Sequence, residues 1–141
     1  MEKVVCDASV IVKWYIEEKY SANALKLRDK YINGEIRIIA PDLMPFEVLN
    51  ALRYSNLFKE DELKAVARSL SYYGIETHPL RNKLAEKTIE IALRSDITIY
   101  DASYVALAIT HNTKLYTADS KLIEKLGKKY EKIVIHISKY N

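Results

Sequence analysis

The chain has 141 residues, of which 49% are hydrophobic and 29% are charged, and its formal net charge is +3. This length and composition predict a single domain over 1–141 with its own hydrophobic core, and they exclude global disorder. No apolar run reaches the roughly 18 to 20 residues that a membrane span requires, and no signal segment opens the chain.

Cysteine usage points to a reducing compartment. Cys6 is the only cysteine, so it has no internal disulfide partner, and no Cys/His spacing suits zinc. We therefore expect a cytoplasmic protein. Glutamine is absent, whereas Ile, Lys, Glu and Tyr are frequent, a usage typical of a thermophile.

Hydrophobic periodicity and turn residues divide the chain into strands and helices. In chain order we expect strand 3–6, helix 9–18, helix 21–33, strand 36–40, helix 45–56, helix 61–73, strand 75–78, helix 82–95, helix 100–111, strand 114–118, helix 120–130 and strand 133–137. Ser21 is a candidate helix cap, and Gly74 is a candidate terminator. Strands joined through helices require crossover connections. The fold class is therefore α/β, a three-layer α/β/α arrangement with a mostly parallel open sheet of about five strands.

One helix and the strand after it bring two carboxylates to the same edge of this fold. The helix 100–111 descends about 16 Å at 1.5 Å per residue, and the strand 114–118 climbs about 16 Å at 3.3 Å per residue. Asp101 at the helix start and Asp119 at the strand end should therefore meet at one rim. The apolar face of this helix is expected to carry Ala102, Val105, Ala106 and Ile109.

Four acidic residues are candidates for one site: Asp7, Glu47, Asp101 and Asp119. Asp7 and Asp119 follow strands, and open parallel sheets bind ligands beyond the carboxyl ends of their strands. Each acid also has a structural interpretation, because Asp7 and Asp119 suit helix caps and Glu47 and Asp101 suit the positive ends of helices. Capping alone, however, gives no reason for all four to gather at one rim.

Electrostatics restricts what such a cluster does. Two carboxylates about 6 Å apart repel by roughly 3 kcal/mol at an effective dielectric of about 20, so four of them need a compensating cation. Oxygen ligands without His or Cys favour Mg²⁺ or Mn²⁺, and Mg²⁺ commonly shares its shell with waters and substrate phosphates. This donor set predicts phosphate chemistry by a metal-activated water. Ser9 and Thr117 are candidate supporting hydroxyls for the carboxylates.

Cations are dense just after Asp119, although the net charge is too small to require a nucleic-acid partner. They are Lys121, Lys125, Lys128, Lys129 and Lys132. Two interpretations stay open: a solvated helix face, or a basic flank that holds a phosphate backbone beside the acidic centre. Tyr100 and Tyr104 flank Asp101 and are candidates for stacking on a base.

Four segments together resemble the PIN-domain nucleases, and the VapC-type toxins of toxin–antitoxin systems among them. They are Val-Val-Cys-Asp-Ala-Ser (4–9), Pro-Phe-Glu-Val-Leu-Asn-Ala-Leu (45–52), Tyr-Asp-Ala-Ser-Tyr-Val-Ala-Leu-Ala (100–108) and Leu-Tyr-Thr-Ala-Asp-Ser-Lys-Leu (115–122). The resemblance covers essentially the whole chain. It implies an endoribonuclease that cuts RNA with Mg²⁺ or Mn²⁺, with catalytic and metal-binding Asp7, Glu47, Asp101 and Asp119 and with Ser9 and Thr117 as companions.

The resemblance also implies a homodimer and a small antitoxin protein whose C-terminal segment blocks the acidic groove. Residues for an apolar antitoxin groove, with core packing as the alternative, are Phe46, Leu49, Leu52, Leu57 and Phe58. Two other functions stay open. A haloacid-dehalogenase-type phosphatase also needs Asp after the first strand, but its second Asp falls where Ser9 stands. A non-catalytic metal-binding interaction module is the third interpretation.

Overall fold

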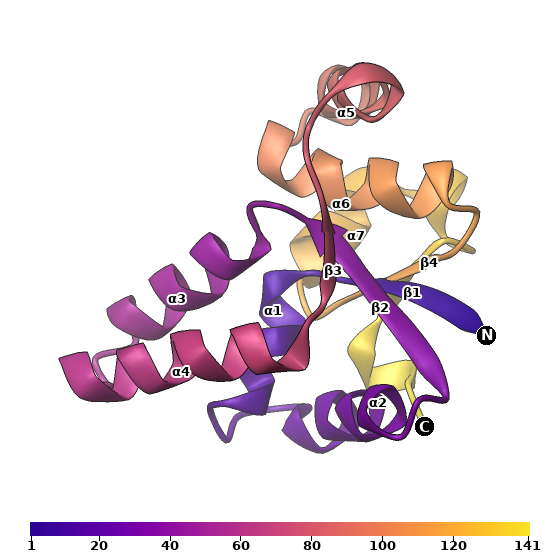
Figure 1. The fold of residues 1–141 in the computed structure, drawn as a ribbon. Helices are drawn as coiled ribbons and strands as arrows, with labels where there is room; N and C mark the ends of the chain where they lie inside the picture. Colours follow the sequence, from indigo (N-terminus) through magenta and orange to yellow (C-terminus); the bar gives the residue numbers. More distant parts are fainter.

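The computed structural model describes every residue, Met1–Asn141. Its centre is a five-stranded sheet in which all neighbouring strands run parallel, in the order β3-β2-β1-β4-β5 (Figure 1). The strands are β1 (Glu2–Cys6), β2 (Ile36–Pro41), β3 (Glu76–His78), β4 (Lys114–Thr117) and β5 (Val134–His136). The predicted α/β class with about five parallel strands is confirmed.

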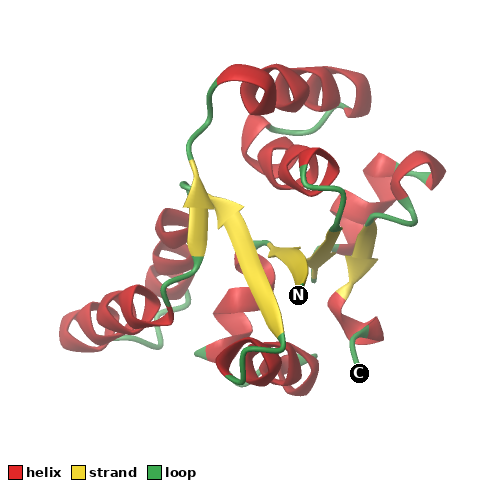
Figure 2. Ribbon diagram, turned by 45° about the vertical axis from the view of Figure 1, so that its right-hand side comes forward, coloured by secondary structure: helices red, strands yellow, loops and turns green.

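Helices cover both faces of this sheet. Those of the first two crossovers are α1 (Ala8–Ile11), α2 (Ser21–Ile32), α3 (Met44–Tyr54) and α4 (Glu60–Tyr73), and those of the last two are α5 (Asn82–Ser95), α6 (Ile99–Thr110) and α7 (Ser120–Leu126). The chain moves from β1 to β3 in one direction and returns to β4 and β5 in the other. Because crossovers are right-handed, this reversal places the two groups of helices on opposite faces (Figures 1 and 2).

The reversal of direction falls between β1 and β4, which pair in register with Cys6 opposite Tyr116. The backbone N–H of Asp7 donates to the Tyr116 carbonyl at 3.3 Å and extends this pairing by one step. Asp7 and Asp119 therefore leave neighbouring strands at the same edge. Such a switch point is where open α/β sheets form a crevice for ligands.

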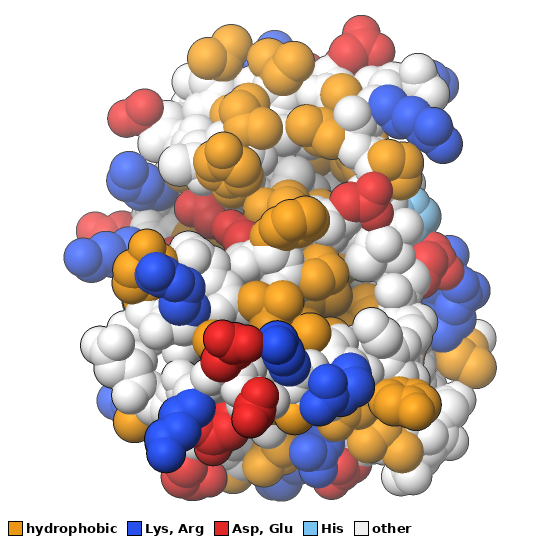
Figure 3. Space-filling model, turned by 60° about the vertical axis from the view of Figure 1, so that its left-hand side comes forward, with side chains coloured by type: hydrophobic (Ala, Val, Ile, Leu, Met, Phe, Trp, Pro, Cys, Tyr) orange, Lys and Arg blue, Asp and Glu red, His pale blue; other side chains and the backbone are white.

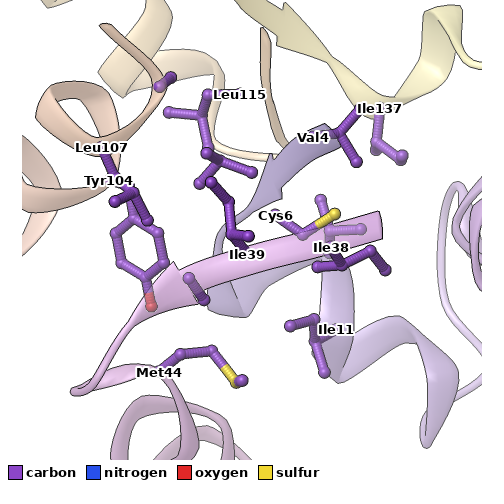
Figure 4. Packing of buried hydrophobic residues seen from close by; sticks show 14 of the residues in the cluster. Val4, Cys6, Ile11, Ile38, Ile39, Met44, Tyr104, Leu107, Leu115 and Ile137 are labelled. Carbon is purple, nitrogen blue, oxygen red and sulfur yellow. The ribbon is translucent and has the colours of Figure 1, made fainter. Parts of the chain in front are cut away.

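The core is continuous across both faces of the sheet. Figure 4 shows Ile11 and Met44 on one side of the central strands and Tyr104 and Leu107 on the other. Inner strand residues such as Ile39 are fully buried. Strands covered on both faces read as continuous apolar runs rather than alternating ones, as 4–6 and 38–40 do.

The helix α6 is buried further round than its sequence pattern predicts. Instead of one apolar face, every residue from Ala102 to Ala108 is buried. The reason is that α6 packs against β1, β2 and β4 on one side and against α5 on the other. Small side chains, three of them alanine at 102, 106 and 108, allow this double packing.

Two predicted helices are shorter than expected. The helix expected over 9–18 ends early, as α1 followed by a 3-10 turn over Val12–Trp14. The Trp14 indole N–H donates to the Ala24 carbonyl at 3.0 Å, which ties this turn to α2. The helix expected over 120–130 breaks at Gly127, whose φ of 70° an L side chain rarely adopts. A 3-10 turn, Lys128–Tyr130, follows the break.

The predicted caps had mixed outcomes. Gly74 ends α4 in the left-handed region, as predicted. Ser21 is not the cap of α2, because Tyr20 holds that position. The Ser21 hydroxyl instead accepts the Glu18 N–H at 2.9 Å and donates to the Ile16 carbonyl at 2.9 Å, so it fixes the turn before the helix.

None of the helices is both long enough and apolar enough to cross a lipid bilayer. On the face in Figure 3, apolar side chains gather over the upper half of the molecule, where α5 lies in Figure 1. Exposed large apolar residues on α5 and at the start of α6 are Ile89, Leu93, Ile99 and Tyr100.

Candidate active site

A cavity of about 470 Å³ opens at the carboxyl ends of β1 and β4. Its twelve lining residues are Asp7, Ala8, Ser9, Val12, Lys13, Glu18, Glu47, Ala51, Asp101, Tyr104, Ala118 and Asp119. All four acidic residues singled out by the sequence are among them, from four separate segments. The prediction that Asp101 and Asp119 meet at one rim of the fold is therefore confirmed.

Asp7 and Asp119 both occupy N-cap positions, yet only one of them caps. The structure shows no capping hydrogen bond from a backbone N–H of α1 to the Asp7 side chain, although the Val10 N–H is close enough to lower the pKa of this carboxyl group. Asp119 Oδ1 accepts the backbone N–H groups of Lys121 and Leu122, each at 3.1 Å. Asp119 therefore caps α7 with one oxygen and leaves the other for the cavity.

Glu47 and Asp101 enter from the first turns of α3 and α6. The Tyr104 hydroxyl donates to Glu47 Oε1 at 2.7 Å and fixes that carboxylate. Tyr104 is only 2% exposed, so the prediction that it stacks on a base is wrong. Its role is to position Glu47. The backbone N–H of Asp101 donates to the Thr98 hydroxyl at 3.0 Å, which holds the start of α6.

Ser9 and Thr117 link the ends of the two central strands. The Ser9 hydroxyl donates to Asp7 Oδ1 at 2.5 Å and accepts the Ala118 backbone N–H at 2.8 Å. Thr117 Oγ1 accepts the Asp119 backbone N–H at 3.0 Å and lies 3.4 Å from the Ser9 oxygen. These hydroxyls orient Asp7 directly and Asp119 through its backbone.

Burial is the main reason why carboxyl groups of the site have raised pKa values. It raises the pKa of Asp7 from 3.8 to about 6, with a further increase from the Asp101 charge and an opposing decrease from the Ser9 and Thr117 hydroxyls. Burial also raises the pKa of Glu47 and of Asp101. The charge of Asp119 adds to the shift of Asp101, and that of Asp101 adds to the shift of Glu47. Mutual repulsion, which the sequence emphasised, is thus secondary to desolvation.

Sequence reasoning missed the two other charged residues of the cavity wall, Lys13 and Glu18. The ammonium group of Lys13, a residue only 7% exposed, donates to Glu18 Oε1 at 3.0 Å and to the Lys19 carbonyl at 2.6 Å. The available signal was a lone lysine inside the apolar run 10–16. A lysine among buried apolar residues needs an acidic partner nearby in the chain or in space.

The four carboxylates face one cavity without forming a closed cage. No group of three or more His, Cys, Asp or Glu side chains is arranged to hold a metal ion by itself. The wall thus offers spaced carboxylate oxygens with room between them. Such a wall suits a hydrated cation better than a cation ligated entirely by protein.

The expected apolar groove residues separate into two groups. Leu52 is fully buried, and Leu49 and Phe58 pack against the core, so core packing is correct for these three. Phe46 is 78% exposed and Leu57 is 66% exposed, on and just after α3. Only these two remain available at the surface.

The parallel sheet and the acidic cavity at its carboxyl edge define the class of protein: it is an α/β protein with a carboxylate site. Comparison with known families then makes the assignment: the family model of the PIN domain matches residues 4–129. The chain belongs to the PIN domain family. The resemblance inferred from four short motifs is confirmed.

Individual relatives support this assignment. The chain is 32% identical over 128 residues to Ribonuclease VapC3 of Pyrobaculum aerophilum. The aligned region covers 87% of this chain and 94% of that protein. The crystal structure of PAE2754 from Pyrobaculum aerophilum matches with a TM-score of 0.64 and 25% identity, covering 97% of this chain and 90% of the other. A toxin-antitoxin complex from Klebsiella pneumoniae shares the fold, with a TM-score of 0.63, 14% identity and coverage of 95% of this chain and 97% of that one.

Proposed function

We propose that this protein is a metal-dependent endoribonuclease that hydrolyses RNA phosphodiester bonds, and that it is the toxin of a toxin–antitoxin pair. The observation that carries the proposal is the gathering of Asp7, Glu47, Asp101 and Asp119 around one cavity at the switch point of the sheet. Identity to a protein named Ribonuclease VapC3 supports RNA as the substrate.

The donor set of the cavity fits Mg²⁺ or Mn²⁺. Its acidic ligands are all oxygen, and three of the four carboxyl groups have a pKa raised by burial. These shifts mean that the ionised site needs positive charge, which a divalent cation supplies. The open spacing leaves room for the waters that Mg²⁺ keeps.

Each residue has a definite task in this proposal. Asp7, Glu47, Asp101 and Asp119 would hold the cation, Asp119 through the oxygen that does not cap α7. Ser9 orients Asp7, and Tyr104 orients Glu47. A bound divalent cation supplies a water of lowered pKa and neutralises charge on the phosphate. With such a cation bound, the chain would need no nucleophilic side chain.

The experiment is cleavage of single-stranded RNA by the purified protein. After chelation of metals by EDTA we expect no cleavage, and excess Mg²⁺ or Mn²⁺ should restore it. Asp7→Asn should reduce the rate by at least about 10²-fold, since a metal ligand is lost. Asp61→Asn, an exposed acid on α4, is the matched control and should retain full activity.

Wild-type rates in an Asp7→Asn variant that remains folded would overturn the assignment of the site. Cleavage that persists in EDTA would overturn the role of the cation. The phosphatase alternative predicts hydrolysis of a small phosphate monoester such as p-nitrophenyl phosphate. We do not expect phosphate monoester hydrolysis, because Ser9 has a hydroxyl group at the position where such a phosphatase has a second carboxyl group.

For partners, we propose a small antitoxin and a homodimer. The antitoxin proposal is supported by a toxin-antitoxin complex of the same fold and by the exposed Phe46 beside Glu47, a residue of the cavity wall. The protein encoded by the adjacent reading frame should inhibit RNA cleavage stoichiometrically, and Phe46→Ala should weaken that inhibition. Light scattering tests the dimer, with Leu93→Glu on α5 as the variant expected to dissociate it.

A further inference from the structure

A second hollow lies directly beside the acidic cavity. It has a volume of about 410 Å³, and its lining residues are Asp96, Ile97, Thr98, Asp101, Asp119, Lys121, Leu122 and Lys125. Asp101 and Asp119 line both hollows, so the second hollow, which we call the groove, adjoins the acidic cavity at these two carboxylates. The wall of this groove carries three acidic residues, Asp96, Asp101 and Asp119, and the ammonium groups of Lys121 and Lys125.

The two lysines lie on the same side of α7. They are four residues apart, which places their side chains one turn from each other on a common face. Both residues are exposed, and the Lys125 ammonium donates to the Asp96 carbonyl at 3.4 Å. Lys125 also lies near enough to Asp101 for its charge to oppose the increase in that pKa caused by burial and by Asp119.

The rest of the lysine cluster does not border the groove. Lys129 lines a different hollow, with Lys87, Arg94 and Tyr130 among its neighbours, and lies 5.6 Å from the Tyr130 ring. Lys128 and Lys132 are exposed and line neither the groove nor the acidic cavity. Of the cluster, therefore, only Lys121 and Lys125 border the acidic site, and the interpretation as a solvated surface stays open for the other three lysines.

The lysine side chains are the only cationic groups that line this groove. Two backbone N–H groups in the first turn of α7, those of Lys121 and Leu122, already donate to Asp119 Oδ1. The groove also lacks an aromatic side chain on which a base would stack. Its polar contacts therefore suit a backbone phosphate better than a base edge.

We propose that Lys121 and Lys125 bind the phosphate group of the RNA strand next to the one hydrolysed over the acidic cavity. This inference rests on the proposed nuclease function and extends it. The enzyme would need a nucleotide on the α7 side of the cleaved bond, and it would hold that nucleotide through its backbone regardless of sequence. A dinucleotide without this neighbouring phosphate would be a poor substrate.

The test compares two double variants that remove the same charge from the same segment. Lys121→Gln/Lys125→Gln alters the groove, and Lys128→Gln/Lys132→Gln is the matched control. Binding of a fluorescent single-stranded RNA is measured against salt in an Asp7→Asn background, in which cleavage should be at least about 10²-fold slower. The groove variant should reduce the slope of log K against log salt by about 0.7, the value for one lost phosphate contact on a single strand. The control should leave the slope unchanged.

A second measurement uses RNA in which the phosphate beside the cleaved bond is replaced by a neutral methylphosphonate. This change should lower the kcat/KM of the wild-type protein about tenfold or more and leave that of the groove variant nearly unaltered. Equal slopes for both double variants, or equal loss on the modified RNA, would overturn the phosphate site while wild-type cleavage stands. Weakened binding of an inhibitory protein with unchanged RNA binding would likewise overturn it. Absence of metal-dependent cleavage by the wild-type protein would instead refute the nuclease function itself.

Discussion

Replacing Asp7 by asparagine should increase the stability of this protein while it lowers its activity. Burial raises the pKa of Asp7 from 3.8 to about 6, so the folded protein holds the proton more tightly than the unfolded chain. Between these two pH values the folded state binds more protons, and the free energy of unfolding therefore falls as pH rises. Above pH 6 the full penalty of the buried charge applies.

The size of this penalty follows from the shift. About two pKa units correspond to roughly 3 kcal/mol at 1.4 kcal/mol per unit. Asparagine cannot ionise, and its amide oxygen still accepts the hydrogen bond from Ser9. The new amide N–H groups of asparagine face hydrogen-bond donors rather than acceptors, which offsets part of this gain. We therefore expect the free energy of unfolding to increase by about 1 to 3 kcal/mol at pH 7.5. At this chain length such a gain raises the melting temperature by about 4 to 12 °C.

The assay is thermal or urea unfolding of both proteins in EDTA between pH 4 and pH 8. The variant should be the more stable protein above pH 6, and the difference should disappear below about pH 4. With Mg²⁺ at 100 times its dissociation constant the wild-type protein should recover about 2.7 kcal/mol, whereas Asp7→Asn should gain much less. A variant that is less stable than the wild type at pH 7.5, or a difference that does not change with pH, would refute the reasoning.

Three further predictions concern the supports of the site and the whole chain. Tyr104→Phe removes the 2.7 Å hydrogen bond to Glu47 at a cost of about 1 to 2 kcal/mol. Because that bond lowers the pKa of Glu47, the acid limb of the pH–rate profile should move to higher pH, and an unmoved limb would exclude this role. Ser9→Ala should cost about 2 kcal/mol in urea unfolding, since the buried Asp7 loses a donor and the Ala118 N–H loses its acceptor; a loss below about 0.5 kcal/mol would contradict it. Calorimetry of the wild-type protein should give a melting temperature above about 65 °C, as the composition predicts, and a value of 45 to 65 °C would count against a thermophilic source.

Much of the site was predictable because it depends on topology. Parallel strands that alternate with helices end at a common edge, so Asp7 and Asp119 had to lie on that edge. The chain runs away from this edge in α6 and back towards it in β4, so Asp101 at the start of α6 lies at the same edge as Asp119. What the sequence did not reveal was the distance between the carboxylates and the way each is held. Tyr104, expected to contact a base, is instead buried against Glu47, because α6 packs between the sheet and α5.

The same division applies to the charged residues. Periodicity on a single helix cannot show which lysines face a groove, because that depends on where neighbouring segments end. The contact of Lys125 with the Asp96 carbonyl and the pairing of Lys13 with Glu18 exist only after the chain has folded. The sequence by itself determined the α/β class and the edge at which the acids lie, since hydrophobic period is a local property and helical crossovers make successive strands parallel. Only the tertiary structure decided burial, which raises the pKa of Asp7, because desolvation is produced by all the segments packed around it.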